Sequence, residues 1–159
     1  MSGIAVIPFR REYAADFRRL NLAWIERLFK VEPIDLEVLD HPERIIIDAG
    51  GMIFFALDGD AVVGTVAMIR AADGRCELAK MAVATTHQGR GIGESLGRAC
   101  RAWAAGNGVR TLFLETNSRL DNAIRLYERL GFRRAVEPNP PEHERCDVYM
   151  ELELDPARS

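Results

Sequence analysis

Gln88-Gly89-Arg90-Gly91-Ile92-Gly93 is the stretch that decides the fold, because it joins a strand-like run of residues to a helix-like run. A glycine-rich turn that leads into a helix presents several unpaired backbone N–H groups, and the helix dipole adds partial positive charge at the same place. Because glycine has no Cβ, a phosphate group can approach that backbone closely. The stretch therefore predicts a phosphate cradle, whose ligand depends on the flanking segments.

The spacing of the glycines excludes two common nucleotide-binding loops. A dinucleotide-binding loop reads Gly-x-Gly-x-x-Gly, whereas the glycines here stand at alternate positions. A Walker A loop ends in Gly-Lys-Ser/Thr, which this stretch lacks. The pattern that remains is Gln-x-x-Gly-x-Gly, at Gln88, Gly91 and Gly93.

The hydrophobic pattern on both sides of the loop predicts alternating strands and helices. Upstream, Asp58-Gly59 and Asp73-Gly74 are turn sequences between apolar runs, which indicates an antiparallel meander. Downstream, apolar residues at helical spacing predict two helices, the second capped by Ser118 with Asp121. The expected strands are 4–9, 52–57, 61–69, 76–83, 109–115, one starting at 132, and 146–154, with a proline-rich loop at 138–141. The expected helices are 12–29, a short one at Pro33, 92–106 and 120–130, with a turn opening at Pro42.

Composition narrows the class of protein. A chain of 159 residues with 48% hydrophobic residues has room for one core, and a net charge of −3 argues against a dedicated binder of nucleic acid or of anionic membranes. The three cysteines, Cys76, Cys100 and Cys146, show no metal-ligand spacing with one another or with the histidines, so we expect reduced thiols and no metal. Neither a signal peptide nor an apolar run of about 20 residues is visible, so a cytoplasmic protein is expected.

Three elements in a fixed order carry a family resemblance. They are Glu77-Leu78-Ala79-Lys80-Met81-Ala82-Val83, the loop 88–93, and Asn122-Ala123-Ile124-Arg125-Leu126-Tyr127-Glu128-Arg129-Leu130-Gly131-Phe132. Through 76–132 the chain resembles the GNAT superfamily of acyl-CoA-dependent N-acetyltransferases. The resemblance implies one α/β domain over 1–159, with a mixed, mostly antiparallel central sheet of about six to seven strands flanked by helices. It also implies that the sheet splays between the fourth and fifth strands.

The same resemblance implies acetyl-CoA as co-substrate. The loop amides are expected to bind the pyrophosphate, and the 81–83 backbone to pair with the pantetheine arm. Asn117 and Asn122 are expected to hydrogen-bond that arm, although asparagine is equally suited to helix capping. The expected cofactor-binding residues are Met81, Ala82, Val83, Gln88, Gly89, Arg90, Gly91, Ile92, Gly93, Asn117 and Asn122.

The implied reaction is direct attack of a neutral amine on the thioester, which needs an acid and a base. Tyr127 stands where the family has its tyrosine acid, while its alternative role is packing on the helix stripe. Glu77 is the first candidate for the base, with Glu115 or ordered water as alternatives. Strand alternation puts Glu77 and Lys80 on opposite faces unless a bulge intervenes. The N–H of Val83 is expected to polarise the carbonyl.

The acceptor is less determined by the sequence. By resemblance its site is built from residues 21–35 and 138–149, and a small-molecule or peptide amine is expected, without nucleic acid or membrane. Exposed strands near the C-terminus are compatible with a homodimer. A non-catalytic acyl-CoA sensor is the alternative function. Candidates for an aromatic wall and acidic anchors are Trp24, Phe29, Glu26, Glu32 and Asp35.

Overall fold

The computed structural model describes residues 3–138 and 140–154, so residue 139 of the expected proline-rich loop lies outside the described residues. The strands are β1 Ile4–Pro8, β2 Met52–Asp58, β3 Ala61–Arg70, β4 Cys76–Val83, β5 Thr111–Thr116, β6 Arg133–Arg134 and β7 Val148–Glu153. The α-helices are α1 Ala14–Leu28, α2 Pro33–Asp40, α3 Ile92–Gly106 and α4 Asp121–Leu130. Short helical turns cover Arg11–Tyr13, Glu43–Ile47 and Thr85–His87.

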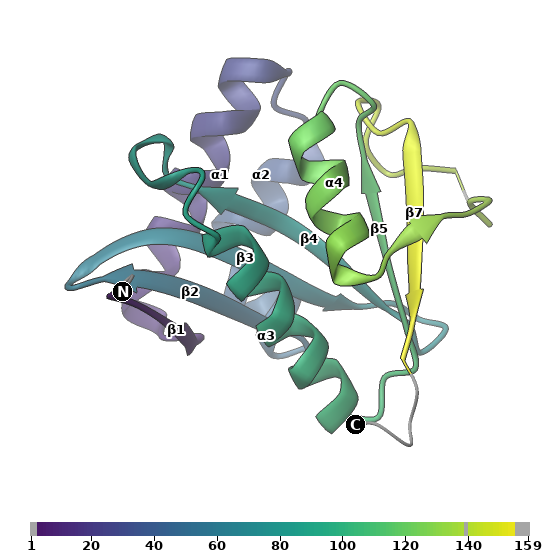
Figure 1. Cartoon of the computed structure of the whole chain (residues 1–159), viewed down its shortest axis with the longest axis horizontal. Helices are drawn as coiled ribbons and strands as arrows, with labels where there is room; N and C mark the ends of the chain where they lie inside the picture. The colour runs from purple at the N-terminus through teal and green to yellow at the C-terminus, as the bar shows by residue number, and fades with distance from the viewer. Residues whose placement is uncertain (1–2, 139, 155–159) are drawn as a thin grey trace.

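The strands form one mixed sheet between two layers of helices. Among the described residues the sheet has 7 strands in the order β1-β2-β3-β4-β5-β7-β6. Neighbouring strands are antiparallel except β4 and β5, whose parallel pairing is confined to Cys76 with Leu112 and Glu77 with Phe113 in the described chain. Helices α1 and α2 lie on one face, and α3 and α4 on the other (Figure 1). The predicted fold class is therefore confirmed, including the splay between the fourth and fifth strands.

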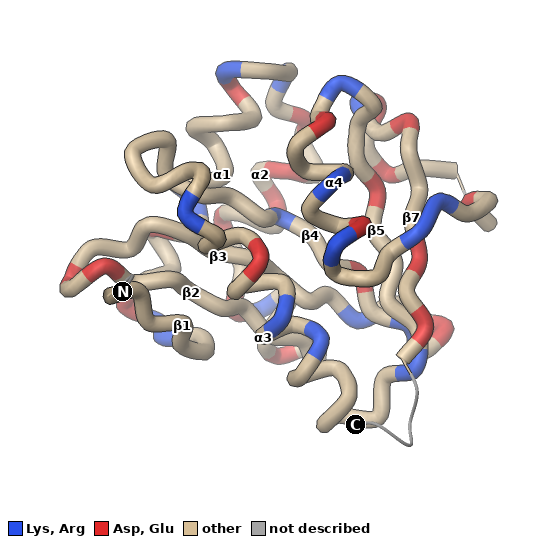
Figure 2. The backbone as a smooth tube through the Cα atoms, in the orientation of Figure 1, with Lys and Arg blue, Asp and Glu red and all other residues tan. Residues whose placement is uncertain are grey.

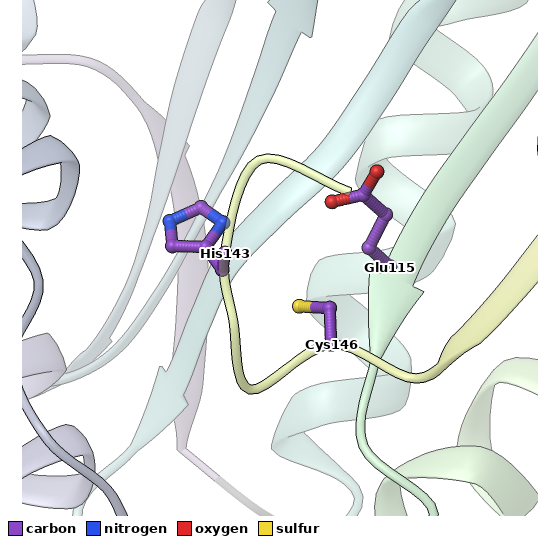
Figure 3. Close-up of side chains that lie close together, drawn as sticks. All are labelled: Glu115, His143 and Cys146. Carbon is purple, nitrogen blue, oxygen red and sulfur yellow. The ribbon is translucent and has the colours of Figure 1, made fainter. Parts of the chain in front are cut away.

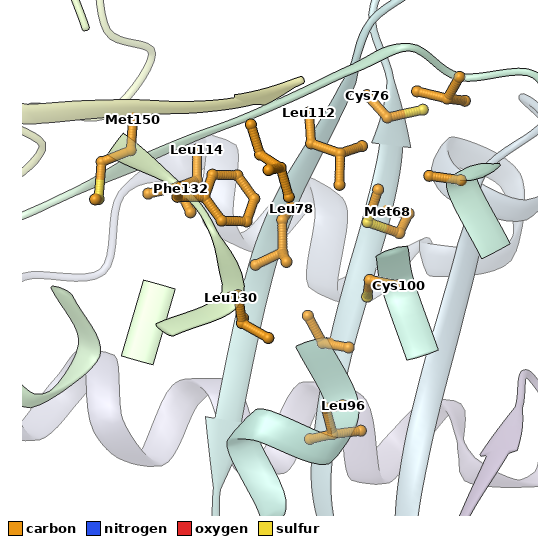
Figure 4. Packing of buried hydrophobic residues seen from close by; sticks show 14 of the residues in the cluster. Met68, Cys76, Leu78, Leu96, Cys100, Leu112, Leu114, Leu130, Phe132 and Met150 are labelled. Atoms are coloured by element: carbon orange, nitrogen blue, oxygen red, sulfur yellow. The ribbon is translucent and has the colours of Figure 1, made fainter. Parts of the chain in front are cut away.

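A hydrophobic core lies on each face of the sheet. On the α3 side, Leu96 and Cys100 pack against Leu78 and Leu112 (Figure 4). On the α1 side, Phe17 and its neighbours pack against Ile53 and Phe55 of β2. All three cysteines are free thiols, with Cys76 and Cys100 buried in the first core. Within the described residues, no helix is long and apolar enough to cross a lipid bilayer.

One local prediction is wrong, and another is confirmed over a short range only. Ser118 does not cap α4, whose N-cap is Leu120 without a side-chain bond; its backbone N–H and hydroxyl instead donate to Asp147, 2.8 Å away in both cases. The strand expected from 132 is a two-residue edge, Arg133–Arg134. Ser118 is bound to Asp147, just before β7, and the short edge strand pairs with β7 itself. Contacts made in the fold therefore decide both places.

Candidate active site

A bulge in β4 sets the geometry of the site. Lys80 has a φ of 55°, and the register with β3 shifts between Thr65 and Ala67, so two β4 residues lie opposite one β3 residue. Leu78 and Met81 consequently both contact the core under α3, while Lys80 reaches the α2 side. The alternation expected from the sequence is therefore wrong beyond the bulge. Glu77 and Lys80 line the same pocket.

Two cavities meet where β4 and β5 diverge. A groove of about 900 Å³ runs between β4, the 87–94 segment and α4. A smaller pocket of about 220 Å³ extends from it toward α1 and the segment before β7. Met81, Ala82, Val83 and Tyr127 line both cavities. Tyr127 therefore stands at the junction of the groove and the pocket.

The glycine loop has the backbone that a phosphate cradle needs. Gly89 and Gly91 have φ values of 78° and 79°, and a Cβ added at either would point into open space. The first helical hydrogen bond of α3 runs from Ser95 N–H to the Gly91 carbonyl, so the N–H groups before Ser95 lie ahead of the α-helical ladder. Gly93 has a further role, because a Cβ there would lie 2.9 Å from Leu126 Cδ2 of α4.

Basic side chains surround the groove, and several are already partnered. Glu94 accepts hydrogen bonds from Arg98 at 2.6 Å and Arg129 at 3.1 Å, so its charge is compensated beside the loop. His87 lies 2.8 Å from Asp58, and Arg90 is exposed. Figure 2 shows basic positions along α4. The arginines lining the groove are Arg27, Arg119, Arg125 and Arg129.

Three candidate proton-transfer groups line the pocket with shifted pKa values. Burial raises the pKa of Tyr127 to about 12, so its phenol stays protonated at neutral pH. Its ring also packs edge-on against Phe132, with centroids 6.1 Å apart. Burial, assisted by the charge of Glu142, raises the pKa of Glu77 to about 7. Burial and a hydrogen bond with Glu137 raise the pKa of Glu115 to about 8.

A buried charge network closes the far side of the pocket. Asp35 of α2 has no exposed surface and accepts from Lys80 Nζ at 2.7 Å and from Arg145 at 2.7 and 2.8 Å. Its Oδ1 also lies 3.1 Å from His143 Nε2. Glu32 accepts from Arg145 and from the N–H of Glu144, both at 3.0 Å.

The sequence suggested Asp35 and Glu32 as acidic anchors for an amine. The structure shows that both are already bound to protein groups, so this expectation is wrong. They fasten residues 143–145 over the pocket. Trp24 and Phe29 do line the pocket, as expected for an aromatic wall. Glu26 is exposed and is not among the residues lining it.

The two asparagines lie at the cavities but have protein partners. Asn117 lines the pocket, donates to the Arg145 carbonyl at 2.6 Å and accepts from the Arg119 N–H at 2.8 Å. Asn122 lines the groove and accepts from Arg125 at 2.7 Å. Neither caps α4, and their contact with a cofactor stays a prediction.

Sequence reasoning missed two groups of residues. The first is the set of arginines around the groove, of which Arg125 and Arg129 could have been found as i, i+4 neighbours on one helix face. The second is His143, Arg145 and Cys146, which line the pocket. The sequence assigned their segment to the acceptor site without naming them. The partners of Arg145, for example, lie 110 and 113 residues away along the chain.

Comparison with known proteins agrees with this architecture. A family model described as the acetyltransferase (GNAT) family matches residues 13–132. A mouse protein named probable N-acetyltransferase family 8 member 5 is 35% identical over 96 residues, which are 57% of this chain and 42% of that protein. The chain spans less than half the length of the curated relatives it matches.

Solved structures share the fold over nearly the whole chain. The crystal structure of a GNAT-family acetyltransferase from Staphylococcus aureus Mu50 has a TM-score of 0.86 at 21% identity, covering 96% of this chain and 99% of that one. The structure of yncA from Salmonella typhimurium with its cofactor acetyl-CoA has a TM-score of 0.76 at 20% identity, covering 96% of this chain and 94% of that one. At these identities the likeness is one of fold.

Proposed function

Because the chain belongs to the acetyltransferase (GNAT) family, we propose that it transfers an acetyl group from acetyl-CoA to a primary amine by direct attack. The resemblance drawn from the three sequence elements is thereby confirmed. The observation that carries the proposal is the position of Tyr127, which lines both the long groove and the smaller pocket. A group at this junction could touch the thioester from one side while the amine enters from the other.

The groove is the proposed site for acetyl-CoA. Its glycine loop combines left-handed backbone, open space above Gly89 and Gly91, and the start of a 15-residue helix. The nearby arginines add positive charge for phosphate groups. The pairing of β4 with β5 ends at Glu77 in the described part of the chain, so β5 does not pair with the backbone at 81–83. The pantetheine arm can therefore form hydrogen bonds with that edge of β4. The relative solved with acetyl-CoA supports this assignment.

The proposed reaction forms one bond and breaks one. The amine nitrogen attacks the thioester carbonyl, the C–N bond forms, and the C–S bond breaks. Tyr127 gives its phenolic proton to the departing thiolate, a role suited to a phenol that burial keeps protonated. The amine gives up its proton to Glu77, whose pKa of about 7 matches that of a base working near neutral pH.

Glu77 is a better base than Glu115 in this geometry. Glu115 has a pKa raised to about 8 by burial and by a hydrogen bond with Glu137, so a larger share of it is protonated at neutral pH. Glu77 lies on β4, the strand on which the cofactor arm is proposed to pair, and shares its face with Lys80. The charge of Lys80 lowers the Glu77 pKa and helps keep the carboxylate available.

Thiol release from acetyl-CoA, measured across a panel of small amines and peptide N-termini, tests the proposal. With an active acceptor in hand, Tyr127→Phe should lower kcat by roughly 10²- to 10⁴-fold, the usual contribution of a positioned acid or base. Tyr13→Phe is the matched control, because Tyr13 packs on Phe55 on the opposite side of the sheet and its loss should leave kcat unchanged. Tight binding of CoA without turnover on any amine would indicate a sensor instead. An unchanged kcat in Tyr127→Phe would contradict the role of the phenol.

A further inference from the structure

Glu115, His143 and Cys146 come together in the wall of the pocket. One donor atom from each residue lies within 4.8 Å of the other two, and Figure 3 shows the three side chains gathered between β5 and the segment before β7. A carboxylate oxygen, an imidazole nitrogen and a thiolate sulfur are all ligands that zinc accepts. The sequence predicted no metal, because it compared cysteines and histidines only along the chain, whereas β5 meets this segment only in the fold.

The histidine of this cluster is oriented by a second carboxylate. Its Nε2 lies 3.1 Å from Asp35 Oδ1 and 3.4 Å from Lys80 Nζ. Asp35 is the nearer partner and its carboxylate accepts a hydrogen bond, so it favours the tautomer that carries hydrogen on Nε2. Figure 3 shows the other ring nitrogen turned toward Glu115 and Cys146. A carboxylate behind a histidine in this way is the usual arrangement around protein-bound zinc.

One carboxylate oxygen of the cluster's glutamate lacks a hydrogen-bond partner among the described residues. Glu115 Oε1 is buried and has no hydrogen-bond partner in the described part of the chain, and the same holds for Glu137 Oε1. Glu115 and Glu137 hydrogen-bond each other while one of them is protonated, and they have no hydrogen to share once both are ionised. Lys80 and Arg145, two cations that line the same pocket, are already bound to Asp35. A buried oxygen without a donor costs free energy that a bound cation would recover.

The segment that carries His143 and Cys146 is also fixed in place. Glu32 and Asp35 hold Arg145 and the N–H of Glu144, and the Cys146 N–H donates to the His143 carbonyl at 3.1 Å. Two of the three donors therefore sit on a braced turn, and the third sits on a sheet strand. Preorganised donors lose little freedom when a metal binds.

We propose that Glu115, His143 and Cys146 form a Zn²⁺ site in the wall of the pocket. Three protein ligands leave the fourth tetrahedral position for water or for a group from the pocket. A Zn²⁺ ion there would occupy the space offered to the amine, so zinc should inhibit acetyl transfer in competition with the acceptor. The binding itself does not depend on the proposed function; the inhibition does.

The test is titration of the chelator-treated full chain with Zn²⁺ alone, against a chromogenic zinc indicator, without acetyl-CoA or amine. One Zn²⁺ per chain is expected. Co²⁺ in its place should give a thiolate-to-metal absorption band. Cys146→Ser should abolish that band and weaken Zn²⁺ binding by at least about 10- to 100-fold, since loss of a supporting partner alone already costs that much. His87→Gln, at a histidine bonded to Asp58 outside the cluster, should change neither.

Three results would overturn the site: no stoichiometric Zn²⁺ in the wild type, equal binding by Cys146→Ser, or loss of binding in His87→Gln. Thermal unfolding of each variant without metal tells loss of a ligand from loss of the fold. His143→Gln is a second variant should Cys146→Ser fail to fold. If zinc binds as expected but no amine is acetylated, the site stands and the proposed function fails. If amines are acetylated and zinc does not bind, the reverse holds.

Discussion

The cofactor side and the acceptor side of this site are held together by different forces. On the cofactor side, the loop 88–93 and the bulged β4 act through backbone geometry that glycines and neighbouring residues set locally. On the acceptor side, Asp35, Lys80 and Arg145 come from three separate parts of the chain and meet in one buried charge cluster. Local backbone geometry tolerates single changes in the surroundings. A buried charge cluster does not, because removing one charged residue leaves another buried charge without its partner.

The largest effect should come from Asp35→Asn, on the acceptor side. The substitution removes the charge that compensates Lys80 and Arg145, and it leaves them buried. Breaking a buried ion pair costs about 3–5 kcal/mol, so the free energy of unfolding should fall by that amount. Urea denaturation measures it. Asp40→Asn is the control: Asp40 pairs with Arg18 while both are about half exposed, and its loss should cost about 0–1 kcal/mol.

The same charge cluster predicts how the stability of the fold changes as the pH falls. Burial raises the pKa of Asp35, but hydrogen bonds from Arg145, His143 and Lys80 outweigh it and hold that pKa well below the usual range. A carboxyl with a lowered pKa stabilises the fold above its unfolded pKa of about 3.9, and this stabilisation is lost as the pH falls below that value. The stability difference between wild type and Asp35→Asn should therefore shrink in acid. A difference that stays constant from pH 7 to pH 3 would contradict the ion cluster as its cause.

The two sides also differ in how far the sequence predicts them. The loop and the helix after it follow from residues close in the chain, so turn chemistry and helical spacing were sufficient to locate them. Tyr127 was singled out by the family resemblance of the residues around it. The bulge at Lys80 and the partners of Asp35 depend on β3, α2 and the segment before β7. No local pattern encodes a contact across 45 or 110 residues, and alternation placed Lys80 on the wrong face for that reason.

The next prediction concerns Glu77, which lies where the two sides meet. Burial and the charge of Glu142 raise its pKa to about 7, and a base works only when deprotonated. The ratio of kcat/KM between wild type and Glu77→Gln should be level above pH 7 and fall about tenfold for each pH unit below it, or about 100-fold at pH 5. Ionisation of the amine affects both proteins and cancels in the ratio.

This profile is to be measured with a chelator present, so that metal at the neighbouring cluster does not contribute. A ratio that stays flat from pH 5 to pH 9 would remove Glu77 as the base and leave Glu115 or water. If Glu115 is the base, the ratio of wild type to Glu115→Gln should instead fall with its midpoint near pH 8, because burial and Glu137 raise the pKa of Glu115 to about 8. Repeating the profile with Glu115→Gln separates the two carboxyls.

The smallest expected effect tests whether the close packing of α3 against α4 shapes the groove on the cofactor side. In α3, a Cβ at Gly97 would clash with the Leu130 side chain of α4, whereas a Cβ at Gly106 would meet no atom within 4 Å. Gly97→Ala should therefore lower the free energy of unfolding by about 1–3 kcal/mol through overpacking. Gly106→Ala should raise it by about 0.4–1 kcal/mol through the unfolded state. Because α4 borders the groove, Gly97→Ala should also raise the KM for acetyl-CoA while Gly106→Ala leaves it unchanged. Equal effects of the two substitutions on both quantities would show that close approach of α3 to α4 does not shape the groove.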